Sequence, residues 1–318
     1  MRWSSAVTFL GSILAVAQAR PSAQGRVRRD IVAKEFKSYT AIGDSYGSGV
    51  GAGSAAPQDK DHTDCHRNVG AYAYLYAQKH PDMEFQFNAC SGAQSGSTLD
   101  VQVTGPNSVF QSPDLVTISA GGNDQASFFD IAVHCSVELQ YGPCDDALAK
   151  ASGTYNGQPF FDSVKRLIVG AATHNPYQVE GRLVLVMGYP ELYNQDSERP
   201  DCMSREYRGK INNIAKDLNK ALEKATKEAG DEIKGFPYFS QATPRFVNVN
   251  DKFKDHHLCN WEERSWIIGG PDSRARINET FIGQDFFHPN VDGHKDGFLA
   301  AMEEDLSSQD IFTGPSVP

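Results

Sequence analysis

The sequence has little positive charge and few long apolar runs, and both shortages exclude classes of protein. Its 318 residues include 30 lysines and arginines against 40 aspartates and glutamates, which gives a formal net charge of −10. Nucleic acids and anionic membrane surfaces bind basic patches, so an acidic chain suits neither. After the first 20 residues no apolar run is long enough to cross a bilayer. We therefore expect no nucleic-acid partner and no stable membrane insertion.

Signals for bound nucleotides and metals are incomplete. The glycine-rich run from Gly47 to Gly53 has Ala52 at the third glycine position of a dinucleotide-binding fingerprint, and it lacks the Lys-Ser/Thr ending of a P-loop. None of the six cysteines forms a C-x-x-C pair. A cluster of Asp, His and Cys at residues 255–259 is the remaining candidate for a metal site. We expect no cofactor and no metal.

The N-terminal residues have the pattern of a secretory signal. Arg2 supplies the positive start, residues 6–17 are apolar, and Ala17-Gln18-Ala19 has the small-x-small form of a cleavage site. A buried N-terminal helix is the alternative, but the segment lacks a polar face. The polar residues that follow end in Arg28-Arg29, a dibasic pair that suits a processing protease.

These features predict a signal peptide over residues 1–19, a propeptide over residues 20–29 and a single domain over residues 30–318. Residues 1–29 contain five arginines and no acidic residue, so their removal would change the formal net charge from −10 to −15. We expect a secreted, extracellular protein. The sequon at Asn278 is consistent with export and glycosylation.

An even number of cysteines in an exported chain favours disulfides. Six cysteines allow 15 pairings, so the spacing alone does not determine them. Cys135 and Cys144 flank a predicted turn at Tyr141-Gly142-Pro143, which favours a local bridge between them. The six are Cys65, Cys90, Cys135, Cys144, Cys202 and Cys259.

Short apolar runs alternate with longer helical patterns along the chain. Continuous apolar runs bounded by glycine are typical of strands that are buried on both faces. The predicted strands cover residues 36–43, 83–89, 115–120, 182–188 and, with a weaker pattern, 245–249; the predicted helices cover residues 70–79, 160–173, 205–228 and 292–306. This alternation predicts a parallel sheet with helices on both faces. Functional residues are then expected after the carboxyl ends of the strands, at Gly43, Ala89, Ala120 and Gly188.

A serine in a tight glycine turn follows the first predicted strand, in Gly43-Asp44-Ser45-Tyr46-Gly47. Such a turn exposes the hydroxyl at the sheet edge where substrates bind, although a helix cap would have the same sequence. The next two strands are followed by Cys90-Ser91-Gly92-Ala93 and Gly121-Gly122-Asn123-Asp124. Gly92 can present its backbone N–H to a substrate because it has no side chain. Asn123 can donate from its amide, or simply cap a helix over residues 125–133.

A histidine with a carboxylate three residues before it stands near the C-terminus, in Asp285-Phe286-Phe287-His288-Pro289. A neutral imidazole can take a serine proton, and a carboxylate can fix its tautomer. Residues three apart can face each other across one helical turn. His294 is a rival base, but it lacks this acidic partner and the following proline. The four blocks together supply a nucleophile, a base, an orienting group and oxyanion donors.

The four blocks, in this order, resemble those of the SGNH hydrolases, also called the GDSL lipase/esterase family, over residues 36–300. The resemblance implies a flavodoxin-like three-layer α/β/α sandwich with about five parallel strands. It implies Ser45 as nucleophile, His288 as base and Asp285 as the group that orients it. The oxyanion hole would consist of the Ser45 and Gly92 N–H groups and the Asn123 side chain. Tyr46 replaces the family's usual leucine, a change that we expect not to affect the chemistry.

The resemblance also implies sequential disulfides, which are Cys65–Cys90, Cys135–Cys144 and Cys202–Cys259. Some relatives orient the histidine with a backbone carbonyl, but the presence of Asp285 predicts a full triad. The implied function is hydrolysis of carboxylic esters by a monomer, with lipid or short-chain acyl esters as substrates. Alternatives are a carbohydrate acetyl esterase of the same fold and a non-catalytic secreted binding protein.

Two further alternatives concern the fold and the substrate pocket. Residues 43–47 also match the G-x-S-x-G elbow of α/β-hydrolases. That family, however, places the elbow deep in the chain and the acid and histidine on separate loops. The segment over residues 250–284 contains Trp261, Trp266 and Phe281. It would line an acyl pocket, act as a lid or belong to the core.

Overall fold

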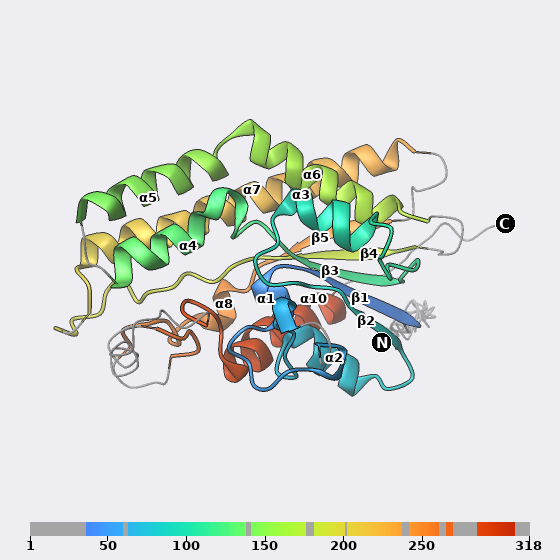
Figure 1. Cartoon of the computed structure of the whole chain (residues 1–318), viewed down its shortest axis with the longest axis horizontal. Helices are drawn as coiled ribbons and strands as arrows, with labels where there is room; N and C mark the ends of the chain where they lie inside the picture. Colours follow the sequence, from blue (N-terminus) through green and yellow to red (C-terminus); the bar gives the residue numbers. More distant parts are fainter. Residues whose placement is uncertain are drawn as a thin grey trace, which may run out of the picture. The chain divides into compact units, whose positions relative to one another are not determined.

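Five parallel strands form one sheet in the order β2-β1-β3-β4-β5 (Figure 1). The computed structural model describes residues 36–59, 63–137, 141–175, 181–200, 202–236, 242–260, 265–269 and 285–308. The strands are β1 (Ser38–Gly43), β2 (Glu84–Phe87), β3 (Leu115–Ser119), β4 (Leu183–Met187) and β5 (Thr243–Val247). All residues of β3 and β4 are buried, as expected for central strands of a covered parallel sheet.

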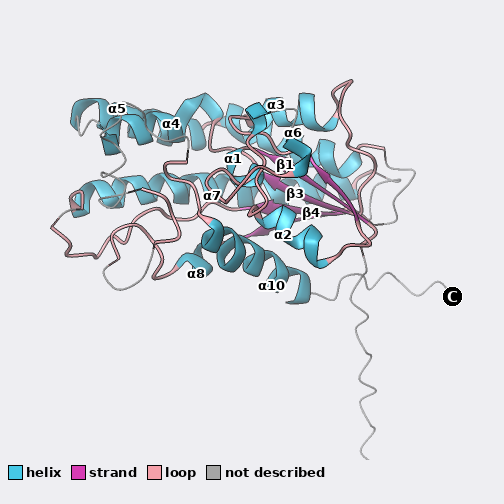
Figure 2. Ribbon diagram, turned by 60° about the horizontal axis from the view of Figure 1, so that its bottom comes forward, coloured by secondary structure: helices cyan, strands magenta, loops and turns pink. Residues whose placement is uncertain are grey.

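Helices cover both faces of this sheet (Figures 1 and 2). One layer contains α3 (Ser95–Ser97), α4 (Ser127–Ile131), α5 (Tyr141–Tyr155), α6 (Gln158–Thr173) and α7 (Arg205–Lys234). The opposite layer contains α2 (Tyr72–Lys79), α8 (Asn250–Phe253), the π-helical segment Gly293–Leu299 and α10 (Ala300–Ser308). The four-residue helix α1 (Ser45–Ser48) begins two residues after β1. The predicted three-layer sandwich is therefore confirmed, and all five predicted strands are present.

One predicted turn is wrong. Tyr141-Gly142-Pro143 is the start of α5 rather than a turn between two cysteines. Proline is tolerated in the first turn of a helix, because backbone N–H groups there have no partner within the helix. Glycine and proline together therefore gave a misleading local signal.

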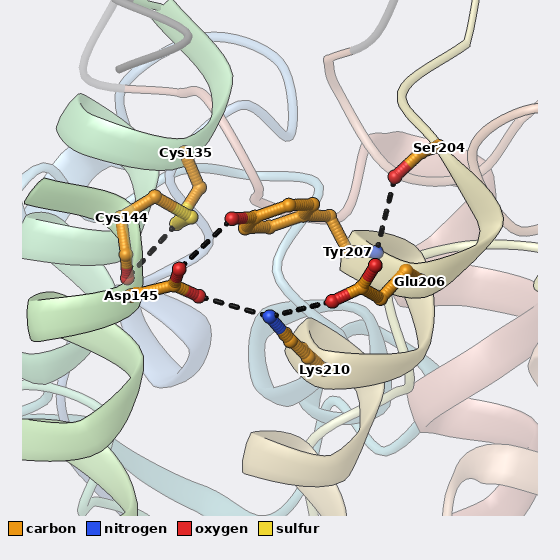
Figure 3. A network of polar contacts seen from close by, with 7 residues as sticks. All are labelled: Cys135, Cys144, Asp145, Ser204, Glu206, Tyr207 and Lys210. Carbon is orange, nitrogen blue, oxygen red and sulfur yellow. Dashed lines mark hydrogen bonds and ion pairs between the residues drawn. A yellow bond between two sulfur atoms is a disulfide. The ribbon is translucent and has the colours of Figure 1, made fainter. Parts of the chain in front are cut away.

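Disulfides and surface polar contacts tie distant segments together. The bonds are Cys65–Cys90, Cys135–Cys144 and Cys202–Cys259, which is the pairing that the resemblance implies. Beside Cys144, Asp145 on α5 accepts hydrogen bonds from Tyr207 and Lys210 on α7, at 3.0 Å each (Figure 3). These exposed contacts help to orient α5 against α7, but they add little to the free energy of unfolding because water screens them.

Several sequence predictions fall outside the described residues. They are the signal peptide and propeptide over residues 1–29, the sequon at Asn278, and Trp261 and Phe281. Every described residue lies within the unit Lys34–Pro318. Within the described residues, none of the helices combines the length and the apolar character needed to span a bilayer.

Candidate active site

Ser45 is the first residue of α1 and is held by the chain around it. The Asp44 side chain caps the helix by accepting a hydrogen bond from the Tyr46 N–H at 3.0 Å. Before it, the side-chain amide of Gln102 binds both backbone groups of Gly43, accepting from its N–H at 2.8 Å and donating to its carbonyl at 2.9 Å. Gly43 has φ +130°, and a Cβ there would lie 2.0 Å from the Ser119 carbonyl oxygen. Only glycine therefore fits the turn that aims Ser45 away from the sheet.

His288 meets Ser45 across 243 positions of sequence. Its Nε2 lies 2.7 Å from the Ser45 Oγ, and its Nδ1 lies 3.0 Å from the carbonyl oxygen of Phe286. A carbonyl only accepts, so Nδ1 carries the hydrogen and Nε2 accepts from the Ser45 hydroxyl. This is the geometry in which a neutral imidazole can take a hydroxyl proton.

The electrostatic surroundings favour the neutral form of His288. Burial lowers the pKa of His288 to about 4, against the Phe286 carbonyl hydrogen bond and the Asp285 charge, which both raise it. The imidazole is therefore an unprotonated acceptor at neutral pH.

The position of Asp285 differs from the sequence expectation. The Phe286 carbonyl, rather than the Asp285 carboxylate, occupies the Nδ1 side of His288, and the backbone carbonyl of Asp285 accepts from the His288 N–H at 3.0 Å. The i, i+3 argument assumed a helical turn. Here Phe287 has φ +65°, which folds the chain into a non-helical turn and brings the Phe286 carbonyl beside the ring. The Asp285 charge and its backbone carbonyl both raise the pKa of His288.

Tyr46 contacts the same turn. Its hydroxyl donates to the Phe287 carbonyl at 2.5 Å, and its ring lies 5.2 Å from the His288 ring, centroid to centroid. Phe287 has a backbone conformation that bulky residues rarely adopt, so it persists only where its surroundings hold it. A leucine at position 46 could not make this hydrogen bond.

One pocket of about 320 Å³ brings four of the predicted site residues together, and Asp285 is not among the described residues that line it. Ser45, Gly92, Asn123 and His288 all line it. Gly92 has φ +81°, and a Cβ built on it would meet nothing within 4 Å, so its backbone borders open space. Asn123 donates one amide hydrogen to the Ala93 carbonyl at 3.3 Å, and its second hydrogen is left for another acceptor. The rest of the lining is mainly apolar and includes Phe128, Phe129, Ala132, Phe286 and Phe287.

A carboxylate links the loops that carry Gly92 and Asn123. Asp124 accepts from the Ser95 N–H at 2.9 Å and from the Ser95 hydroxyl at 2.6 Å. Burial raises the pKa of Asp124, and both hydrogen bonds from Ser95 oppose that rise. The link fixes the spacing between the two potential donors.

Tyr189 supports the other side of the site. Its hydroxyl donates to Asp44 at 2.5 Å and accepts from the Gly122 N–H at 3.2 Å. Burial raises the pKa of Asp44 to about 7, although the Tyr189 hydrogen bond lowers it. Tyr189 directly follows Gly188, one of the strand ends where the sequence predicts functional residues. Its position was therefore the available signal, but no motif marked it.

The rival base, the candidate metal cluster and Trp266 take no part in the pair formed by Ser45 and His288. His294 is fully buried, and its Nδ1 accepts from the Tyr72 N–H at 3.4 Å, whereas Ser45 pairs with His288. Cys259, part of the candidate metal cluster, is bonded to Cys202 and so offers no thiolate. Trp266 stacks on a neighbouring histidine ring at 3.6 Å and is not among the described residues that line the pocket.

The sequence matches a family model and several known proteins. The family model described as GDSL-like Lipase/Acylhydrolase matches residues 39–298. A lipase of Streptomyces rimosus is 32% identical over 264 residues, which cover 83% of this chain and 85% of that protein. Lipase 1 of Streptomyces coelicolor is 30% identical over 305 residues, covering 95% and 98%.

Two solved structures have the same fold. The crystal structure of the extracellular lipase from Streptomyces rimosus matches with a TM-score of 0.66 and 28% identity, covering 84% of this chain and 99% of that chain. The structure of phospholipase A1 from Streptomyces albidoflavus matches with a TM-score of 0.68 and 27% identity, covering 85% and 99%. The chain therefore belongs to the GDSL-like lipase/acylhydrolase family and is a carboxylic ester hydrolase.

Proposed function

We propose that the chain is a secreted serine hydrolase that cleaves esters of apolar acids through an acyl-enzyme on Ser45. The observation that carries this proposal is the 2.7 Å contact between the Ser45 Oγ and the His288 Nε2. His288 takes the hydroxyl proton as Ser45 attacks the ester carbonyl, and it returns the proton to the leaving alcohol. Water then attacks the acyl-enzyme by the same route and releases the acid. The Phe286 carbonyl holds the imidazole in the required tautomer.

The negative charge that develops on the ester oxygen needs donors. The Ser45 and Gly92 N–H groups and the free amide hydrogen of Asn123 serve as the oxyanion hole. All three residues border the pocket that contains His288, which supports this assignment. Asn123→Ala should lower kcat by roughly 10²–10³-fold. An unchanged kcat would remove Asn123 from the oxyanion hole.

The lining of the pocket favours an apolar acyl group. Its aromatic residues, Phe128, Phe129, Phe286 and Phe287, offer contact to hydrocarbon. An acetyl group on a polysaccharide would leave most of this surface unused. The lipases and the phospholipase A1 that the chain resembles point in the same direction.

A serine-reactive phosphonate tests the nucleophile, and a substrate series tests the acyl preference. The purified chain should be labelled at Ser45, and Ser45→Ala should be neither labelled nor active. The kcat/KM of the purified chain should be higher on p-nitrophenyl esters of longer acyl groups than on p-nitrophenyl acetate. Folded protein that resists the probe would instead support a binding protein, and the highest rate on acetylated xylan would support the carbohydrate esterase.

Export and processing form part of the proposal. The signal pattern over residues 1–19, the dibasic pair at Arg28-Arg29 and three disulfides support a secreted, mature chain beginning near Asp30. Intact mass of protein recovered from culture medium should match a start near Asp30, with a loss of mass after deglycosylation if Asn278 is modified. A chain retained inside cells with residues 1–29 intact would contradict this part. Light scattering should give the mass of a monomer.

A further inference from the structure

A second hollow adjoins the pocket that contains Ser45 and His288. It is an open groove of about 700 Å³ beside the edge strand β2, and Ser91 and Gly92 line both hollows. We propose that this groove binds the distal part of a long acyl chain. The ester carbonyl lies at Ser45, and the hydrocarbon passes over Gly92 into the groove. This inference rests on the proposed function, which does not itself require the groove.

The passage between the two hollows is open at Gly92. This residue has φ +81°, and the space where a side chain would stand contains no atom within 4 Å. The leaving alcohol must lie next to His288, because it receives its proton from that ring. His288 is not among the described residues that line the groove. The groove is therefore placed for the acyl side of the ester rather than for the alcohol.

The walls of the groove are hydrocarbon. Phe85 and Phe87 of β2 lie with ring centroids 5.5 Å apart, and both line it. Val101 and Val109 also line it, and they are 65% and 51% exposed. Large apolar side chains with such exposure are few among the described residues, and a third one, Phe129, borders the catalytic pocket. Exposed apolar surface concentrated along a hollow marks a binding site for apolar ligand.

Several polar side chains of the groove are already hydrogen-bonded inside the protein. Both amide atoms of Gln102 bind the Gly43 backbone, at 2.8 and 2.9 Å. The Asn88 amide and the Ser108 hydroxyl both donate to the Gln102 carbonyl, at 3.4 and 2.6 Å. These three side chains are therefore not available to a sugar ring, which favours hydrocarbon along this part of the groove.

The charge of the groove is also compensated. Arg67 is the ionisable residue among the described lining, and its guanidinium lies 3.2 Å from the Asp59 carboxylate. The Arg67 Nε also donates to the Ala89 carbonyl at 2.9 Å. A phosphate or carboxylate head group would have to compete with these partners. An uncharged chain would not disturb them.

Charged substitutions at the exposed valines test the groove. Val101→Asp and Val109→Asp should each lower kcat/KM for p-nitrophenyl palmitate by at least tenfold, and leave p-nitrophenyl butyrate within twofold. Loss of contact with each methylene is worth about fourfold, so two or three methylenes give this effect. Phe236→Asp is the matched control, because Phe236 is an exposed apolar residue that does not line the groove. It should change neither rate.

The outcomes separate the alternatives. Equal losses on palmitate and butyrate, or no loss on either, would overturn the inference. A loss on hexadecyl acetate without a loss on palmitate would assign the groove to the alcohol and overturn it as well. Failure of the proposed function is measured separately, as absence of butyrate hydrolysis and of Ser45 labelling in the unsubstituted chain.

Discussion

The group that orients His288 determines how much a substitution of Asp285 will lower kcat. Because the Phe286 carbonyl already binds Nδ1 at 3.0 Å, the tautomer does not depend on the Asp285 side chain. We expect Asp285→Asn to lower kcat on p-nitrophenyl butyrate by less than about tenfold. His288→Ala should lower it by about 10⁴-fold or more. A loss near 10⁴-fold for Asp285→Asn would return the orienting role to the carboxylate.

The pH dependence of the reaction should report the burial of His288. Burial lowers its pKa to about 4, so the neutral base persists well below pH 6.5. We expect the titration of His288 to leave kcat/KM level above about pH 5 and to lower it about tenfold per pH unit below about pH 4. The free energy of unfolding should fall with pH in the same direction, because the pKa of His288 is lower in the folded chain than in the unfolded chain. The stability that this histidine contributes is present above its unfolded pKa of about 6.5 and is lost as pH falls through about 4. Enzyme incubated in acid and assayed at pH 7 separates unfolding from titration, and a midpoint near pH 6.5 would contradict the assignment.

Tyr46 is a positioning residue for the same histidine. Tyr46→Phe keeps the ring but leaves the Phe287 carbonyl without its donor, which costs about 1–3 kcal/mol in a buried site. We expect kcat to fall about 10- to 100-fold with KM nearly unchanged, because the loosened turn misplaces the base rather than the substrate. Tyr39→Phe is the control, since its buried hydroxyl pairs with Thr117 within the sheet, at 2.8 Å. Equal effects on kcat from both variants would indicate general destabilisation.

The sequence predicts those site residues whose role requires a particular side chain. Ser45, Asn123 and His288 stand in recognisable blocks, and the structure brings them to one pocket. The Phe286 carbonyl could not be identified in this way, because every residue has a carbonyl and only the turn at Phe287 directs this one. Nothing in the sequence indicates that Tyr46 matters for the site, because its hydrogen bond is to a residue 241 positions away.

At the scale of elements, strands were easier to predict than helix ends. Buried parallel strands such as β4 read as continuous apolar runs that glycine bounds, so composition and length suffice. The start of α5 was missed because glycine and proline mark both turns and first helical turns. The order β2-β1-β3-β4-β5 depends on which strands pair, and no single segment contains that information.

The junction of β1 and α1 is the element on which the site depends most. Gly43→Ala would place a methyl group 2.0 Å from the Ser119 carbonyl oxygen at φ +130°, so β1 and β3 would have to separate. We expect a loss of at least about 3 kcal/mol in the free energy of unfolding, together with loss of Ser45 labelling. Gly153→Ala in α5 is the control, because a Cβ there meets nothing within 4 Å and alanine favours helix. That variant should gain up to about 1 kcal/mol in urea unfolding, and a comparable loss in both variants would contradict the explanation.

At the scale of the whole molecule, Ser45 and His288 meet only after nearly the entire chain has folded. Their contact spans 243 positions, and the π-helical segment that follows His288 packs against α2, more than 200 residues earlier in the chain, before it continues into α10. Long-range contacts of this kind are expensive in chain entropy, so they need links that restrict the unfolded chain. The three disulfides are such links, and they close loops with sequence separations of 25, 9 and 57 residues.

Loop closure ranks the three disulfides by their contribution to stability. In the chain-entropy relation, loops of these lengths correspond to roughly 3.5, 2.5 and 4 kcal/mol for Cys65–Cys90, Cys135–Cys144 and Cys202–Cys259. We expect paired alanine substitutions to lower the urea midpoint in that proportion, with the Cys202/Cys259 pair losing most. Its effect should reach the site as well, since Cys259 lies in the stretch that leads to residues 265–269, and Ile268 exchanges backbone hydrogen bonds with the turn at His288. Equal midpoints for all three paired variants would show that local strain or residual structure, rather than loop length, governs how these bonds stabilise the fold.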